Sequence, residues 1–480
     1  MSFRLAIAEK PSVAQSIAKV LGATKRRSGY LEGNGWLVSW CLGHLVGLVE
    51  PAQYEERYRT WRTEDLPIVP DSWIYEVTDS TKKQFSILKT LMNRKDVTEL
   101  VECTEAGREG ELIFRLVYHQ CHCPKPFRRL WISSMEDTAI REGFAHLRDS
   151  LEYDALYQAA LCREHADWLV GINATRFFSC LYGQTLAVGR VMTPTLSMIV
   201  TRDAEIAVFQ EEPFYTVRLE IDGVTVESRK FKDKSEAERL KNACMEDGEA
   251  LVLRMERKRK TKQPPALYDL TSLQRDTNRM LGFTAQQTLQ YAQSLYEKKL
   301  ITYPRTDSRY LTEDLAEGLG NLTQSVAAAY GMQGKQPFHA ERMIDNSKVT
   351  DHHAILPTKI MPQLPLSELP SGEQSVLRLI AARLLAASGE PHRYEEMTAV
   401  YTCADTELTA KDTVVLQNGW KETEEFFGLN RKKARETSPA GSLEEFSEGT
   451  FVIVQKAEIH EGKTSPPRPY TEDLCCTRRT

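Results

Sequence analysis

The sequence has little excess charge of either sign and no long apolar run. Its formal net charge is −5 over 480 residues, and its pI is about 6.1. A globally basic chain, the usual electrostatic signature of a nucleic-acid binder, is therefore excluded, although a local basic cluster is not. No stretch approaches the ~20 apolar residues of a membrane span, and the N-terminus has no signal-peptide core, so we expect a cytoplasmic protein.

Cysteine spacing excludes two further classes. The chain has 10 cysteines, but Cys121-His122-Cys123 and Cys475-Cys476 are too tightly spaced for the usual disulfide or zinc pairs. We expect reduced and mostly buried thiols. The sequence has no internal repeat or low-complexity tract, and its composition is ordinary for a globular protein. Its length predicts about three or more domains.

Two strand-to-helix units carry acidic residues at their strand ends. Residues 3–8 read as a buried strand that leads into Glu9-Lys10-Pro11-Ser12 and a helix, and residues 99–104 read as a second strand that leads into Glu105. Open α/β sheets place their ligands at the carboxyl ends of strands. We therefore expect Glu9 and Glu105 to meet.

The first helix has its own boundary signals. Ser12 and Gln15 have the spacing of a capping box, and Gly22 is placed to end the helix.

A tyrosine follows a third predicted helix. Thr284 and Gln287 form a capping box at the start of that helix, and Tyr303 lies just past its end, before Pro304 and Arg305. Proline biases the preceding residue toward extended backbone. A tyrosine hydroxyl two residues from a guanidinium is a candidate nucleophile, and the alternative is a packed core or turn tyrosine, since the chain has 18 tyrosines.

These segments together resemble a known family. Glu9-Lys10-Pro11-Ser12 and Arg108-Glu109-Gly110-Glu111 resemble the toprim metal site, and the run 303–308 resembles the nucleophile motif of type IA DNA topoisomerases, specifically the topoisomerase III branch. Further matches follow in the family's order, namely Gly43-His44-Leu45, Trp131-Ile132-Ser133-Ser134, residues 167–176, Gly189-Arg190-Val191 with residues 193–196, and Asp351-His352-His353-Ala354-Ile355 with Pro357-Thr358.

The resemblance implies an α/β toprim (Rossmann-like) domain combined with helical and β-arch domains in a multi-domain toroid. The implied domains are toprim at 1–145, a first helical DNA-binding part at 146–208, a β-rich arch at 209–267 and 394–464, and a helical domain at 268–393 that carries the tyrosine. The residues after 465 resemble a segment that leads into more helices, but 474–480 lack any periodicity. We expect a truncated or frameshifted chain whose helical DNA-binding domain is incomplete.

The resemblance also implies a reaction: ATP-independent cleavage of single-stranded DNA through a 5′-phosphotyrosine, strand passage and religation, with relaxation of negative supercoils or decatenation. In that scheme Tyr303 is the nucleophile, Arg305 neutralises the phosphorane, Glu9 protonates the leaving oxygen and Lys10 is an electrostatic clamp. The implied cofactor is Mg²⁺, held by Glu9, Glu105, Glu109 and Glu111.

The implied DNA contacts are His44, Arg163, Asp167, Arg176, Ala187, Val188, Gly189, Arg190, Val191, Met192 and His352. The alternative for the polar members is a helix-packing role. Single-stranded and negatively supercoiled DNA are the expected substrates of an expected monomer, and a helicase is a candidate partner. Two departures bear on this site: Glu105 and Gly107 replace the family's Asp-x-Asp, and Ala187 and Met192 replace its usual Ser and Gln.

Three alternatives stay open. A toprim nuclease or primase would share the carboxylates without using Tyr303, and a catalytically impaired single-stranded-DNA-binding remnant would follow from the expected truncation and from Gly107. A dense basic run, 254–262, is either a solvated linker between domains or a strip that faces DNA. The preferred substrate, the host element and the helicase are not specified by the sequence.

Overall fold

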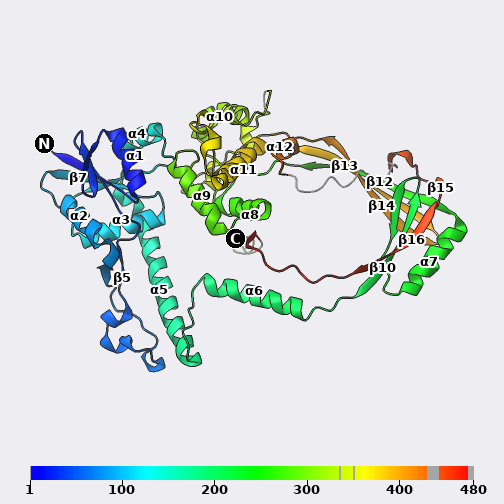
Figure 1. Ribbon diagram of the computed structural model, residues 1–480, viewed down its shortest axis with the longest axis horizontal. Helices are drawn as coiled ribbons and strands as arrows, with labels where there is room; N and C mark the ends of the chain where they lie inside the picture. The colour runs from blue at the N-terminus through cyan, green and yellow to red at the C-terminus, as the bar shows by residue number, and fades with distance from the viewer. Residues whose placement is uncertain (1, 335–336, 350–351, 430–442, 474–480) are drawn as a thin grey trace.

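The structure is a computed structural model that describes residues 2–334, 337–349, 352–429 and 443–473. Asp351 and the tail 474–480, including Cys475-Cys476, lie outside this part of the chain. An α/β domain, a helical domain and a β-rich domain follow one another along the long axis (Figure 1). One elongated connection joins the helical domain to the β-rich domain, and another leads from the α/β domain to the β-rich domain. Within the described residues, no helix combines the length and the apolarity needed to cross a lipid bilayer.

The α/β domain is built on a seven-stranded sheet of order β2-β3-β4-β1-β7-β8-β9. Its four central strands, β4, β1, β7 and β8, are parallel, which brings the carboxyl ends of β1 and β7 side by side. The strands are β1 (Phe3–Ala8), β2 (Lys25–Arg27), β3 (Tyr30–Gly33), β4 (Trp36–Trp40), β7 (Val97–Cys103), β8 (Phe127–Arg129) and β9 (Arg148–Asp149). The helices are α1 (Pro11–Leu21), α2 (Lys82–Met92), α3 (Arg108–Gln120) and α4 (Asp137–Ala145), and a separate ribbon pairs β5 (Val46–Leu48) with β6 (Tyr75–Val77).

Two long helices leave this domain. The first, α5 (Asp154–Tyr182), packs on α3 and then extends away from the sheet, and the second, α6 (Met192–Ala207), runs toward the β-rich domain (Figure 1). Both carry large apolar side chains that stay exposed, among them Phe177, Leu181, Leu196 and Val200.

The β-rich domain is a second seven-stranded sheet, of order β15-β12-β13-β14-β11-β10-β16, with all pairs antiparallel. Its strands are β10 (Pro213–Ile221), β11 (Val224–Ser228), β12 (Glu249–Lys262), β13 (His392–Cys403), β14 (Thr406–Gln417), β15 (Phe451–Ile453) and β16 (Lys456–Lys463), and α7 (Lys234–Asp247) packs on one face. The Asp222-Gly223 turn joins β10 to β11, with both turn residues at positive φ.

The helical domain is inserted between β12 and β13, as the alternation of helical and β patterns predicts. It contains α8 (Leu270–Leu281), α9 (Ala285–Glu297), α10 (Ala316–Ala329) and α11 (Ser371–Ala387). A fifth helix, α12 (Lys421–Phe426), follows β14 in sequence but packs on α11, and the buried Phe427 joins the core of the helical domain. Residues 421–427 therefore pack with the tyrosine-bearing domain, although the sequence places them in the arch.

Helix ends test the capping predictions directly. The box at Thr284 and Gln287 is confirmed, with both of its hydrogen bonds present. The box at Ser12 and Gln15 is wrong, because Pro11 is already the first residue of α1 and Lys10 is its N-cap. Proline is favoured at that first helical position since it has no N–H to satisfy. Gly22 ends α1 in the left-handed conformation, as predicted.

Candidate active site

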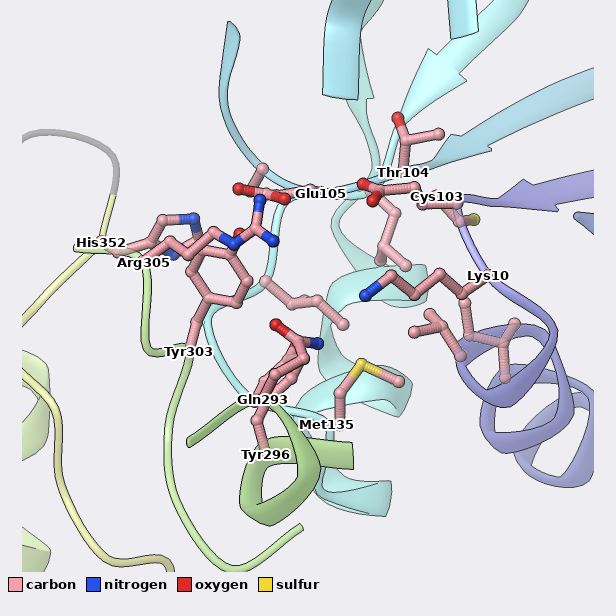
Figure 2. Close-up of a pocket in the computed structure, with 16 residues that line it drawn as sticks. Lys10, Cys103, Thr104, Glu105, Met135, Gln293, Tyr296, Tyr303, Arg305 and His352 are labelled. Atoms are coloured by element: carbon pink, nitrogen blue, oxygen red, sulfur yellow. The ribbon is translucent and has the colours of Figure 1, made fainter. Parts of the chain in front are cut away.

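A pocket lies where the carboxyl edge of the first sheet meets the helical domain. Glu9 and Lys10, after β1, and Glu105, after β7, line it from one side, whereas Tyr303 and Arg305 line it from the other. In Figure 2 the side chains of Glu105, Arg305 and Tyr303 point toward one another, and Lys10 reaches in from the far wall. The two acidic strand ends therefore meet, and they meet beside the candidate nucleophile.

Tyr303 is held rigidly by its neighbours. Its ring is 5% exposed and lies between those of Tyr296 and His352, at centroid distances of 5.3 Å and 4.5 Å. Its backbone N–H donates to the carbonyl of Ser133 in the toprim domain, at 3.2 Å. Its hydroxyl is buried and interacts with the facing carboxylate of Glu105, although the two groups do not form a hydrogen bond of ordinary geometry. A buried hydroxyl with only this weak contact is a position that a substrate atom can complete.

The charges around Tyr303 hold its phenol in the protonated form. Burial raises the pKa of Tyr303, and the negative charge of Glu105 beside it raises that pKa further, while Arg305 lowers it. Burial also raises the pKa of Glu105 itself. A reaction that needs the tyrosine oxygen must therefore bring compensating positive charge, and Arg305 is the exposed guanidinium already in place.

His352 sits against the same tyrosine. Its Nδ1 is 3.1 Å from the hydroxyl of Ser133, whereas its buried Nε2 has no partner among the described residues. Burial lowers the pKa of His352 to about 4, so the ring is neutral at physiological pH. Ser133 thus contacts both Tyr303 and His352, a role that the sequence did not assign although it lies in a matched motif.

The backbone around Glu105 is fixed by a glycine and a buried arginine. A Cβ on Gly110 would lie 1.9 Å from the carbonyl oxygen of Glu105, so only glycine allows α3 to approach this loop. Arg129, fully buried, donates to the carbonyls of Glu102, Thr104 and Glu105. Sequence reasoning did not identify Arg129. The one sequence signal that could have identified Arg129 is the pair Arg128-Arg129 in a strand. Successive residues of a strand face opposite sides of the sheet, so one of the two arginines must point inward.

The four predicted metal-binding carboxylates do not form one cluster. Glu9 and Glu105 share the pocket, but Glu109 is 3.4 Å from the Nε2 of His44. Glu111 is fully buried and lies 2.8 Å from Arg129 and 2.9 Å from Arg115. The expectation for Glu111 as a metal ligand is thereby corrected, because the two arginines already occupy its carboxylate. No group of three or more potential metal ligands occurs within the described residues.

The residues that remain could still hold a hard divalent cation. Mg²⁺ is often bound by one or two carboxylates together with waters and substrate phosphates. Glu9 and Glu105, on the same wall, match that number, and burial of Glu105 disfavours its charged form, which a cation would stabilise. The residues present therefore fit a site of two carboxylates, completed by a phosphate.

Several predicted DNA contacts lie on α5 or pair with residues near it. His44 pairs with Glu109, and this contact raises the pKa of the imidazole. Farther out, Arg190 forms two hydrogen bonds with Asp167, whose carboxylate is also 3.9 Å from Arg163. We call His44, Arg163, Asp167 and Arg190 the α5 polar track. All four are exposed.

The other predicted DNA contacts divide into a loop and a buried residue. Residues 187–191 lie in the loop between α5 and α6, and Met192 begins α6. The hydroxyl of Thr175 anchors this loop, because it accepts a hydrogen bond from the N–H of Val188 at 2.9 Å. Arg176 is buried instead, and its guanidinium donates to the carbonyl of Tyr58 at 2.7 Å. The expectation for Arg176 as a DNA contact is corrected, because its donor points into the protein.

The basic run at 254–262 belongs to β12 and is not a linker. Three of its cations form ion pairs with carboxylates of the same strand or of β13. Lys258 pairs with Glu256, Arg259 with Glu395 and Lys260 with Glu396. The pairing lowers the net positive charge that this strand can offer to phosphates.

Known proteins resemble this chain over nearly its whole length. The sequence model of the DNA topoisomerase family matches residues 152–474, and that of the Toprim domain matches residues 4–135. The DNA topoisomerase 3 of Bacillus subtilis is 39% identical over 98% of this chain, and that of Shouchella clausii is 40% identical over 98%. The chain covers 66% of each of these relatives, about two thirds of their length.

A solved structure shares the fold. Full-length topoisomerase I from Thermotoga maritima aligns with 99% of this chain and 74% of its own, with a TM-score of 0.73 at 24% sequence identity. The two matched families, the relatives and this common fold agree with the pocket, in which toprim carboxylates face a buried tyrosine. The chain belongs to the DNA topoisomerase family, as a type IA member of the topoisomerase III branch.

Proposed function

We propose that the chain cleaves single-stranded DNA without ATP, through a 5′-phosphotyrosine at Tyr303, and reseals it after strand passage. The observation that carries the proposal is the Tyr303 hydroxyl, which is buried and faces Glu105 in a pocket that also contains Lys10 and Arg305. A toprim nuclease or primase would need the carboxylates but not this tyrosine, so its place in the pocket favours the topoisomerase reaction.

The residues of the pocket account for each bond and proton in the proposed reaction. The Tyr303 oxygen attacks the phosphorus, its proton passes by way of the facing Glu105 carboxylate to solvent, and the bond from phosphorus to the 3′ oxygen breaks. Arg305 stabilises the negative charge that develops on the phosphoryl oxygens, and Lys10 holds the phosphate electrostatically. Glu9 gives a proton to the departing 3′ oxygen and is left as the ionised carboxylate, the form that can bind Mg²⁺. Religation is the reverse reaction, with the 3′ hydroxyl as nucleophile and tyrosine as leaving group.

Magnesium is the proposed cofactor, with Glu9 and Glu105 as its protein ligands. When bound, Mg²⁺ supplies positive charge that holds the DNA phosphate beside the carboxylates. The α5 polar track and the loop 187–192 are the proposed path of the single strand toward the pocket. We further propose that the protein acts as a cytoplasmic monomer on negatively supercoiled DNA, with a helicase as the candidate partner that supplies single strands.

Incubation with a single-stranded oligonucleotide labelled at its 3′ end, followed by denaturation, tests the proposal. Cleavage should leave the labelled fragment attached to the protein through its 5′ phosphate and release an unlabelled fragment with a 3′ hydroxyl. Attachment through a 3′ phosphate, or cleavage without any attachment, would contradict the proposed reaction.

Gly107 allows a test of the metal site. Its φ of 171° is extended backbone, and a Cβ placed there would be no closer than 4.0 Å to any atom, the nearest being Oε1 of Glu105. Gly107→Asp would therefore add a carboxylate beside Glu105. We expect the magnesium concentration for half-maximal religation to fall several-fold, and the rise in unfolding temperature on adding magnesium to increase.

The control for this variant is Gly107→Asn. Gly107 is the N-cap of α3 and has no side-chain cap, so either Asp or Asn can cap the helix and stabilise it by roughly a few tenths of a kcal/mol. Only Asp adds charge. An equal magnesium titration for the two variants would show that position 107 does not contribute to the metal site.

A further inference from the structure

A lysine in an unfavourable backbone conformation begins the segment that carries Tyr303. Lys299 has φ of 66°, in the left-handed region where helix ends usually have glycine. The chain closes α9 around it, because the N–H of Leu300 donates to the carbonyl of Leu295 and the N–H of Lys299 to that of Tyr296. Glycine would satisfy the same backbone without the conformational cost, so the lysine side chain needs a separate explanation.

That side chain crosses to the other half of the active site. The ammonium of Lys299 lies 2.5 Å from Asp137, the first residue of α4 in the toprim domain, and both groups are half-buried. Asp137 also lies 3.6 Å from Lys19, on the exposed side of α1. The hydrogen bond from Lys299 is the largest cause that lowers the pKa of Asp137. The pair therefore joins the tyrosine-bearing domain to the toprim domain.

The ion pair is close to the nucleophile along the chain. Only three residues separate Lys299 from Tyr303, and backbone hydrogen bonds from Thr302 to Leu356 and from Thr358 to Leu300 hold this segment in place. The next hydrogen bond is the one from the Tyr303 N–H to Ser133, which also crosses the domain boundary. A rigid segment fixed to the toprim domain at both ends leaves the tyrosine little freedom to move.

We propose that Lys299 is a positioning residue, whose ion pair with Asp137 holds Tyr303 against the toprim carboxylates and must break whenever the two domains separate. The inference rests on the proposed function for its catalytic consequence, but the docking of the two domains can be measured without DNA. The amide of Tyr303 reports on it directly, since its hydrogen bond to Ser133 exists only while the domains are in contact.

The experiment compares amide hydrogen exchange at Tyr303 in the full chain, resolved by mass spectrometry of overlapping peptides. Lys299→Gly and Asp137→Asn should each speed exchange about three- to tenfold. The double variant should exchange no faster than the faster single variant, because both remove the same pair. Lys299→Arg should retain most of the protection. Relief of the left-handed strain should leave the unfolding midpoint of Lys299→Gly no lower than that of the wild type.

Lys298→Ala is the matched control. Lys298 also forms a 2.5 Å ion pair, but with Glu373 in its own domain, so its loss should not change exchange at Tyr303. In DNA assays, Lys299→Gly should slow covalent trapping at saturating oligonucleotide and leave oligonucleotide affinity unchanged. Unchanged exchange in Lys299→Gly, or independent effects that multiply in the double variant, would overturn the proposal. A wild-type protein that shows the exchange pattern but never traps DNA would instead overturn the proposed function.

Discussion

Tyr303→Phe should abolish covalent trapping of DNA, while binding of a single-stranded oligonucleotide stays within about twofold of the wild type. The substitution removes the one oxygen that can attack phosphorus. It should not disturb the fold, because the ring keeps its packing against Tyr296 and His352 and the deleted hydroxyl makes only a weak contact with Glu105. Removal of this buried hydroxyl should leave the unfolding temperature close to that of the wild type.

Tyr296→Phe is the control for this prediction. Tyr296 lines the same pocket, is also buried and packs edge-on against Tyr303, but its hydroxyl has no place in the proposed reaction. We expect the Tyr296→Phe protein to trap DNA at a rate close to that of the wild type. Trapping through a 5′ phosphate in the Tyr303→Phe protein would refute the nucleophile assignment, and loss of trapping in both variants would indicate a packing effect.

The parts of the site that the sequence predicts are those encoded locally. Strand and helix periodicity placed Glu9 and Glu105 at neighbouring strand ends, and a capping box with a following proline placed Tyr303 outside α9. Such features depend on residues a few positions apart. The same local reasoning failed at Ser12, where two start signals overlap and Pro11 begins the helix first.

The parts that the sequence did not predict depend on partners far away in the chain. The resemblance implied Glu111 as a metal ligand, and one of the two arginines that occupy its carboxylate, Arg129, comes from the next strand. Lys299 and Asp137 are 162 positions apart, and no periodicity connects them. Two acidic partners of the basic run in β12, Glu395 and Glu396, come from β13, beyond the whole inserted domain. Charge pairing between distant segments requires the fold to be known.

Arg129→Met should cause a large loss of stability in the toprim domain. Methionine is unbranched and apolar, but it leaves the carboxylate of Glu102 buried without its nearest cation, leaves Glu111 with Arg115 alone, and frees the carbonyls that Arg129 binds, including that of Glu105. Breaking a buried ion pair by removing one partner costs about 3–5 kcal/mol. We therefore expect the unfolding midpoint of this domain to fall by on the order of 10 °C, and DNA trapping to fall with it as Glu105 loses its anchor.

Two comparisons separate the buried charges from a general effect of losing an arginine. Arg128→Met removes the neighbouring, exposed arginine, whose pair with Glu99 is at the surface, and should cost about 1 kcal/mol or less.

The second comparison is the dependence of stability on pH. Burial raises the pKa of Glu102 in the folded protein, Arg129 opposes that shift, and its removal should raise the pKa further. The folded state then binds a proton more tightly than the unfolded state does, so stability is gained as the pH falls. The stability deficit of the Arg129→Met protein relative to the wild type should accordingly be smaller at pH 5.5 than at pH 8.5. The first pH is roughly one unit above the ordinary pKa of a carboxyl group, and the second is well above it. A deficit that is constant over this interval would place the cost in the lost carbonyl hydrogen bonds, and a deficit no larger than that of Arg128→Met would contradict the prediction.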